Sequence, residues 1–179
     1  MNSSKRRSFL SLDRQYQKIA QIFNEICSHF SSKKDYIYLF AKYDTRNEWW
    51  FRGELIWLFE KLSLKFSLEE KVNGDYLDFV LYIGNQRHLM ELKVMSIGKY
   101  GLRSYFSENH LFKDFNRLIR KSEKYKWVLT FAYPSDIASW KKQVKSVEER
   151  NREIKCFRIC TINLEPLGKA CVVSLWNIR

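Results

Sequence analysis

The residues best suited to chemistry in this 179-residue chain lie at positions 76–94, where two apolar runs flank Gly84-Asn85. A glycine-first pair between β-prone runs is typical of a two-residue hairpin turn, so this stretch predicts two antiparallel strands. Counting outward from the turn places Asp78 directly opposite Glu91, and directly opposed side chains share one face of a sheet. Because side chains alternate along a strand, Lys93 lies on that face too.

This set of side chains predicts a metal site with catalytic potential. Two carboxylates side by side repel each other, and a bound cation removes that repulsion. Carboxylate oxygens are hard ligands that suit Mg²⁺ or Mn²⁺. Such a cation also suits phosphodiester hydrolysis, because it neutralises the anionic oxygens that repel a nucleophile and lowers the pKa of bound water. The ammonium group of Lys93 could orient the nucleophile and stabilise developing charge.

A third carboxylate, Glu54, lies within a predicted helix that is apolar nearly all round, on a stripe shared with Phe51 and Leu58. A charge on a core-facing stripe is costly unless something pairs with it. One alternative is a neighbouring cation, Arg52 or Lys61, or an orientation that reaches solvent. The other alternative is the metal held by the hairpin, which would make Glu54 a further ligand.

The remaining pattern predicts, in order, two helices, three strands, a helix, a strand, a helix and two strands. Helices that alternate with strands after an antiparallel start favour an α/β fold with a central mixed β-sheet flanked by helices. Residues 1–10 are expected to form a basic disordered tail, followed by a single domain over residues 11–179. The first helix is expected to begin at Ser11 or Asp13, and the state of residues 31–46 stays open.

The charge of the chain predicts a polyanionic partner. It carries 32 Lys and Arg against 20 Asp and Glu, a net charge of +12, and nucleic acid suits this balance better than a membrane surface. Residues 95–108 combine glycines, cations and aromatic rings at the end of the hairpin, and the helix expected over 109–125 has a basic outer face. We therefore expect DNA contacts from Lys99, Tyr100, Arg103, Arg117 and Lys121. For residues 95–108 an ordinary loop remains the alternative.

The order of these elements resembles the PD-(D/E)XK nuclease superfamily. A helix that carries Glu54 comes first, then Asp78 on one strand and Glu91-Leu92-Lys93 on its hairpin partner, and then a helix and a strand. The resemblance covers roughly residues 47–133 and implies a restriction-endonuclease-like fold. It departs from the family pattern at Leu77, where a proline often precedes the acid.

The resemblance also implies roles for these residues. Asp78 and Glu91 would be metal ligands together with the backbone carbonyl of Leu92. Lys93 would be the catalytic lysine, and Glu54 would match the helix acid of many members. The implied activity is that of a Mg²⁺- or Mn²⁺-dependent endonuclease that hydrolyses DNA phosphodiester bonds. A homodimer or a partner subunit would then supply specificity.

Two other functions stay open. The same fold could serve a non-catalytic nucleic-acid-binding or assembly subunit, in which these charges form only a salt-bridge cluster. A basic module that binds protein or RNA would need no catalytic set. His88 is expected to face away from Glu91 and Lys93 and to be structural.

The cellular setting is expected to be the cytoplasm, without a membrane anchor. No apolar run reaches the roughly 18 residues of a membrane span, and the N-terminus lacks the apolar region of a signal peptide. The cysteines lie in apolar segments without Cys-x-x-Cys spacing, so reduced core residues are expected. These are Cys27, Cys156, Cys160 and Cys171.

Overall fold

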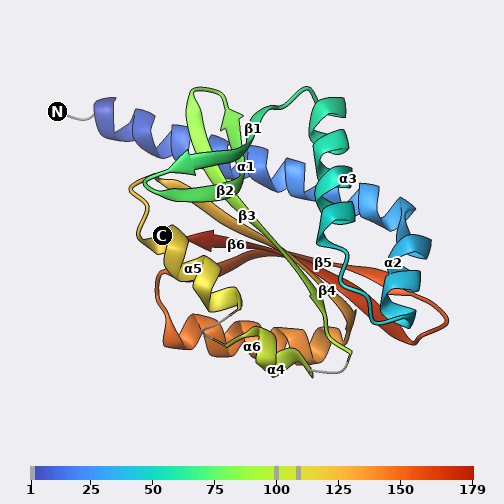
Figure 1. The fold of residues 1–179 in the computed structure, drawn as a ribbon. Coiled ribbons are helices and arrows are strands. Elements are labelled where there is room, and N and C mark those ends of the chain that lie inside the picture. Colours follow the sequence, from blue (N-terminus) through green and yellow to red (C-terminus); the bar gives the residue numbers. More distant parts are fainter. Residues whose placement is uncertain (1–2, 99–100, 108–109) are drawn as a thin grey trace.

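The computed structural model describes residues 3–98, 101–107 and 110–179, and Figure 1 shows a twisted sheet with helices packed on it. Its elements are α1 Ser3–Ser32, α2 Lys34–Lys42, α3 Glu48–Lys61, β1 Lys65–Val72, β2 Asp75–Ile83, β3 Gln86–Ser96, α4 Gly101–Tyr105, α5 Leu111–Ile119, β4 Tyr125–Ser135, α6 Ile137–Arg150, β5 Ile154–Leu164 and β6 Lys169–Ile178.

The sheet is mixed, as the sequence predicts. Its strands lie in the order β1-β2-β3-β4-β6-β5. Of the neighbouring pairs, β3 and β4 run parallel and the others antiparallel. A parallel pair needs a crossover connection, which α4 and α5 provide. The predicted α/β class with a central mixed sheet flanked by helices is confirmed.

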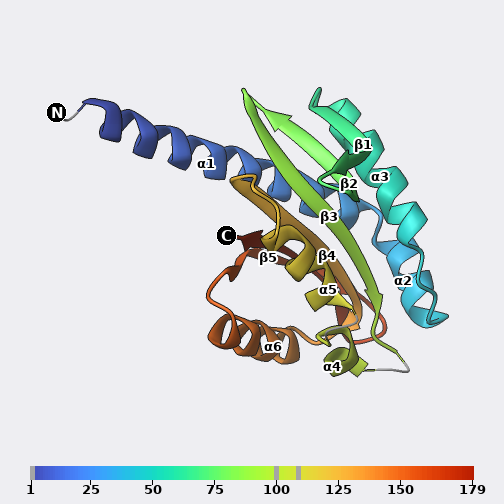
Figure 2. The same cartoon turned by 60° about the vertical axis from the view of Figure 1, so that its left-hand side comes forward.

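Each face of the sheet has its own apolar core. Figure 2 shows α1, α2 and α3 on one side and α4, α5 and α6 on the other. Phe51 of α3 packs on Phe131 of β4 in the first core, and Phe115 of α5 packs on Trp176 of β6 in the second. Along β3, Met90 and Leu92 belong to the first core. Because side chains alternate along a strand, Glu91 and Lys93 face the α5 side. None of the described helices is both long and apolar enough to cross a membrane.

The helix boundaries differ from the expected ones in α1 and α5, and the structure adds two short helices, α2 and α4. α1 begins at Ser3, so residues 3–10 are helical where a disordered tail was expected. They contain neither glycine nor proline, and extending a helix that is already anchored costs little. Residues 34–42, left open above, form α2. α5 ends at Ile119, and Tyr125, which was expected to end this helix, is the first residue of β4.

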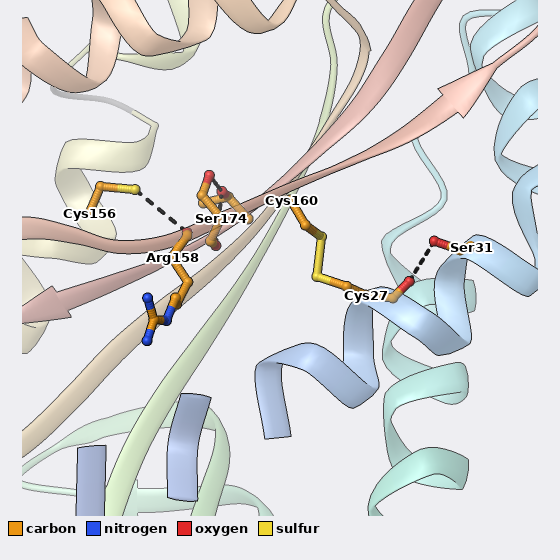
Figure 3. The surroundings of a disulfide bond; sticks show 7 residues. Cys27, Ser31, Cys156, Arg158, Cys160 and Ser174 are labelled. Carbon is orange, nitrogen blue, oxygen red and sulfur yellow. Dashed lines mark hydrogen bonds between the residues drawn. A yellow bond between two sulfur atoms is a disulfide. The ribbon is translucent and has the colours of Figure 1, made fainter. Parts of the chain in front are cut away.

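A disulfide joins Cys27 of α1 to Cys160 of β5, with their Cα atoms 6.5 Å apart and a sequence separation of 133. Figure 3 shows the bond bridging the helix and the sheet. The expectation of reduced cysteines is therefore wrong for this pair, while Cys156 and Cys171 are free. Nothing local in the sequence reveals that these two segments are neighbours.

Removing this cross-link should lower the free energy of unfolding by at least about 2 kcal/mol, because the bond restricts a long loop of the unfolded chain. Denaturant unfolding of a Cys27→Ser/Cys160→Ser variant, compared with the parent protein without reductant, measures the loss. Cys156→Ser is the matched control, since it removes a free thiol. Equal stability of the double variant and the parent would contradict this prediction.

Candidate functional site

The turn at Gly84-Asn85 sets the register of β2 and β3 as predicted. Gly84 has a φ of +58°, in the left-handed region that favours glycine. Ile83 pairs with Gln86, and the ladder continues without a shift to Phe79 opposite Met90. The ladder ends at that pair, so the predicted pairing of Asp78 with Glu91, one step further outward, is not formed.

The strands of this hairpin separate where the acids lie. Hydrogen-bonded pairs alternate along an antiparallel hairpin, so continued pairing would have the backbone N–H of Leu92 donate to Leu77. That N–H donates to Oδ2 of Asp78 instead, at 2.8 Å. The carboxylate of Asp78 thus takes the place of a strand acceptor, and β3 continues alongside β4 (Figure 1).

Glu91 is an acid buried with too little positive charge around it. The residue is 1% exposed, and its Oε2 lies 2.7 Å from Nη2 of Arg117 on α5. Its other oxygen, Oε1, is buried and has no hydrogen-bond partner among the described residues. Burial raises the pKa of the Glu91 carboxyl to about 9, while Arg117 lowers it and Asp78 raises it further. A second cation beside Glu91 would lower this pKa and so favour the charged form of the carboxyl group.

Lys93 lies on the same face as Glu91, as strand alternation predicts. Its Nζ is 3.2 Å from Oδ2 of Asp114 on α5, and Oδ1 of Asp114 is 3.3 Å from Nη2 of Arg117. Ion pairs therefore run from Lys93 through Asp114 and Arg117 to Glu91. We call these four residues, with Asp78, the hairpin cluster.

α3 reaches the hairpin cluster from the other side of the sheet. Nη1 of Arg52 lies 3.6 Å from Oδ1 of Asp78. Glu48 and Trp49, one turn earlier on α3, line a cavity of about 100 Å³ together with Arg52, Asp78 and Leu92. The separation of the strands therefore leaves a small opening next to one of the predicted metal ligands.

Glu54 does not lie in this group, contrary to its predicted role. Its Oε2 is 2.7 Å from Nε2 of His29, and its Oε1 is 3.8 Å from Nζ of Lys33. Two positions along a helix correspond to a rotation of about 200°, so Glu54 points away when Arg52 faces Asp78. The partner of this half-buried carboxylate is thus a histidine of α1, and neither the metal site nor Arg52.

The donor set of the hairpin suits one hard cation. Within the described part of the chain, no three side chains of the types His, Cys, Asp and Glu are grouped as metal ligands. Asp78 and Glu91 would supply two carboxylates, and the backbone carbonyl of Leu92 would be the third oxygen donor that the resemblance implies. Mg²⁺ commonly keeps several waters and uses only one or two carboxylates, so this set is sufficient. The unpartnered Oε1 of Glu91 is the observation that supports the fit.

Two residues expected to contact DNA have other partners. Nζ of Lys121 is buried and donates to the carbonyl of Val72 at 2.7 Å and to the carboxylate of Asp75, so Lys121 holds the turn between β1 and β2. Arg117 pairs with the acids of the hairpin cluster. Both predictions assumed that cations on an amphipathic helix face water, but long side chains at the edges of that face reach inward.

Of the other three residues expected to contact DNA, Arg103 belongs to α4. Arg103 is exposed and lines a cavity of about 450 Å³ with Phe106 of the following turn and Lys142 of α6. Lys99 and Tyr100 lie outside the described residues. Of this group, Arg103 alone is placed by the structure, on a basic surface.

Asp114 is the functional candidate that the sequence did not single out. It lies on the inward stripe of α5, between Leu111 and Leu118 at helical spacing. A carboxylate on an apolar stripe was the signal used for Glu54, and the same signal would have found Asp114.

Comparison with protein-family models, curated proteins and solved structures finds no match for this chain. The choice of function therefore rests on the geometry of the hairpin cluster.

Proposed function

We propose that this protein is a metal-dependent nuclease that hydrolyses phosphodiester bonds in DNA, with Asp78, Glu91 and Lys93 as its catalytic set. One observation carries the proposal. The carboxylate of Asp78 bonds the N–H of Leu92, directly after Glu91, and Glu91 keeps a buried oxygen without a partner. Two acids from opposed strands therefore meet where β2 and β3 separate.

The order of the elements supports a restriction-endonuclease-like fold. Residues 48–135 run through α3, the antiparallel strands β1, β2 and β3, then α4, α5 and β4. This order of helix, hairpin strands, helix and strand is the one that the resemblance to the PD-(D/E)XK superfamily implies.

Asp78 and Glu91, with the carbonyl of Leu92, would hold Mg²⁺ or Mn²⁺. The bound cation would neutralise phosphate charge and lower the pKa of a bound water. Glu91 must give up its proton or part of its contact with Arg117 to act as a ligand, which leaves Arg117 available to the anionic phosphate. Lys93 directs a positive charge toward the face on which negative charge develops during hydrolysis.

Asp114 acts in this scheme as a positioning residue. Its contact with Lys93 at 3.2 Å limits the rotation of the ammonium group. An ammonium group held in place before the reaction stabilises charge without reorganising during it.

Incubation with labelled linear duplex, branched and single-stranded DNA, each with Mg²⁺, Mn²⁺ or EDTA, tests the proposal. We expect cleavage of at least one substrate with a divalent cation and none with EDTA, with products that carry 5′-phosphate and 3′-hydroxyl ends. RNA of the same sequence serves as the comparison substrate. Lack of cleavage of every DNA under all conditions would contradict the proposal.

A non-catalytic nucleic-acid-binding or assembly subunit is the second candidate, and the ion pairs favour it. Arg117 already contacts Glu91, and Lys93 already contacts Asp114, so the acids have partners without a metal. Calorimetry with Mn²⁺ separates the two functions. A nuclease site should bind Mn²⁺ and lose that binding in Asp78→Asn, whereas a salt-bridge cluster should bind none in either protein.

Glu54→Gln should leave the cleavage rate within about threefold of the parent, because Glu54 contacts His29 and faces away from Asp78. Cleavage of the best substrate under Mg²⁺ measures this, with Glu91→Gln as the matched variant of the same chemical change. Loss of activity in both variants would indicate that Glu54 is a ligand of the metal.

A further inference from the structure

Trp49 is the most exposed of the large apolar side chains in the described part of the chain, at 77%. Tryptophan is highly buried on average, and burying a large apolar side chain stabilises a protein. An indole ring exposed to water in the first turn of α3 therefore indicates a surface that a binding partner covers.

The position of Trp49 indicates what could cover it. Its ring lies 5.7 Å from the guanidinium of Arg52, which in turn approaches Asp78. Trp49, Arg52, Asp78 and Leu92 line the same small cavity. A strand bound with a phosphate at Asp78 and Glu91 would thus carry a base past an exposed aromatic ring with a cation beside it.

We propose that Trp49 stacks on an unpaired base of the nucleic acid next to the phosphate that is cut, so that the substrate is single-stranded or locally unpaired DNA. This inference rests on the proposed function for the position of the phosphate. In a duplex each base is stacked on its neighbours and has no free face to offer a protruding ring. An unpaired base does, and stacking is tolerant of sequence because every base has a π-face.

Trp57 provides a matched control on the same helix. It is 53% exposed, but its ring stacks on His29 with centroids 5.1 Å apart and lies 5.1 Å from Nζ of Lys61. Because His29 contacts Glu54, Trp57 lies on the side of α3 that faces away from Asp78.

The test measures binding of fluorescein-labelled single-stranded and duplex DNA of the same sequence by anisotropy, in EDTA so that nothing is cleaved. Trp49→Ala should weaken single-strand binding by about tenfold, and Trp49→Phe should restore most of it. Trp57→Ala should stay within about twofold of the parent, as should duplex binding by Trp49→Ala. Circular dichroism confirms that each variant is folded.

Binding that is unchanged in Trp49→Ala, or weakened equally for single strand and duplex, would overturn the stacking role. Absence of single-strand binding by the parent would overturn it as well. A selective loss in Trp49→Ala from a parent that cleaves no DNA would support the stacking role while contradicting the nuclease, so the two proposals fail separately.

Discussion

Replacing Lys93 by alanine is expected to lower the rate of Mg²⁺-dependent DNA cleavage by about 10²- to 10³-fold, because a pre-positioned charge that stabilises the transition state is removed. Its ammonium group contacts Asp114, and Lys93 lies two residues after Glu91 on the same face of β3. Single-turnover cleavage of the best substrate measures the loss. Asp78→Asn should show a loss of similar size together with weaker Mn²⁺ binding.

The matched control for this prediction is Lys71→Ala. Lys71 is an exposed lysine of β1, and its nearest described aromatic contact is Tyr76, at 5.9 Å. The Lys71→Ala substitution removes the same charge from the protein and should leave the cleavage rate unchanged. If both lysine variants lost activity equally, Lys93 would act only through general attraction of DNA. Full activity in Lys93→Ala would remove it from the catalytic set.

Lowering the pH from 6.5 to 4 is expected to remove about 3 kcal/mol of folding free energy through His88 alone. Burial lowers the pKa of His88 to about 4, from an ordinary value of 6.5. The unfolded chain therefore binds the proton first as the pH falls. The stability contribution is complete above pH 6.5 and is lost progressively between pH 6.5 and pH 4.

The contacts of His88 explain why its neutral form is required. Nε1 of Trp127 donates to Nδ1 of His88 at 3.1 Å, so Nδ1 must be unprotonated. Nε2 lies 3.1 Å from Oε1 of Gln15, which accepts its proton, and the ring stacks on Tyr125 at 4.4 Å. A proton on Nδ1 would break the bond to Trp127 and place an unpaired charge in the core. The expectation that His88 is structural and faces away from Glu91 agrees with these contacts.

Denaturant unfolding of the parent and of His88→Gln at pH 7, 6, 5 and 4 checks this prediction. Between pH 6.5 and pH 4 the free energy of unfolding should fall more steeply in the parent than in His88→Gln, and the two slopes should begin to converge near pH 4. His110→Gln is the matched control and should follow the parent. Parallel curves for the parent and His88→Gln would show that His88 accepts its proton equally well in the folded and unfolded chain.

Short-range features were predictable from the chain alone. The turn at Gly84-Asn85 fixes its own register, and alternation then places Glu91 and Lys93 on one face, because both depend on neighbours within a few residues. The cap of α3 is equally local, since Asn47 accepts from the N–H of Trp50 at 3.3 Å. The class of the fold followed from the order of such local patterns.

The sequence by itself thus determined the hairpin and the face that carries Glu91 and Lys93. The tertiary structure alone decided that Glu54 contacts His29, that Arg117 contacts Glu91 and that Cys27 meets Cys160. The physical reason is that the rotation of a helix about its own axis, and its position on the sheet, are set by packing between segments far apart in the chain. A periodic pattern shows which stripe is apolar, but the partner of a charge at its edge depends on what that stripe packs against.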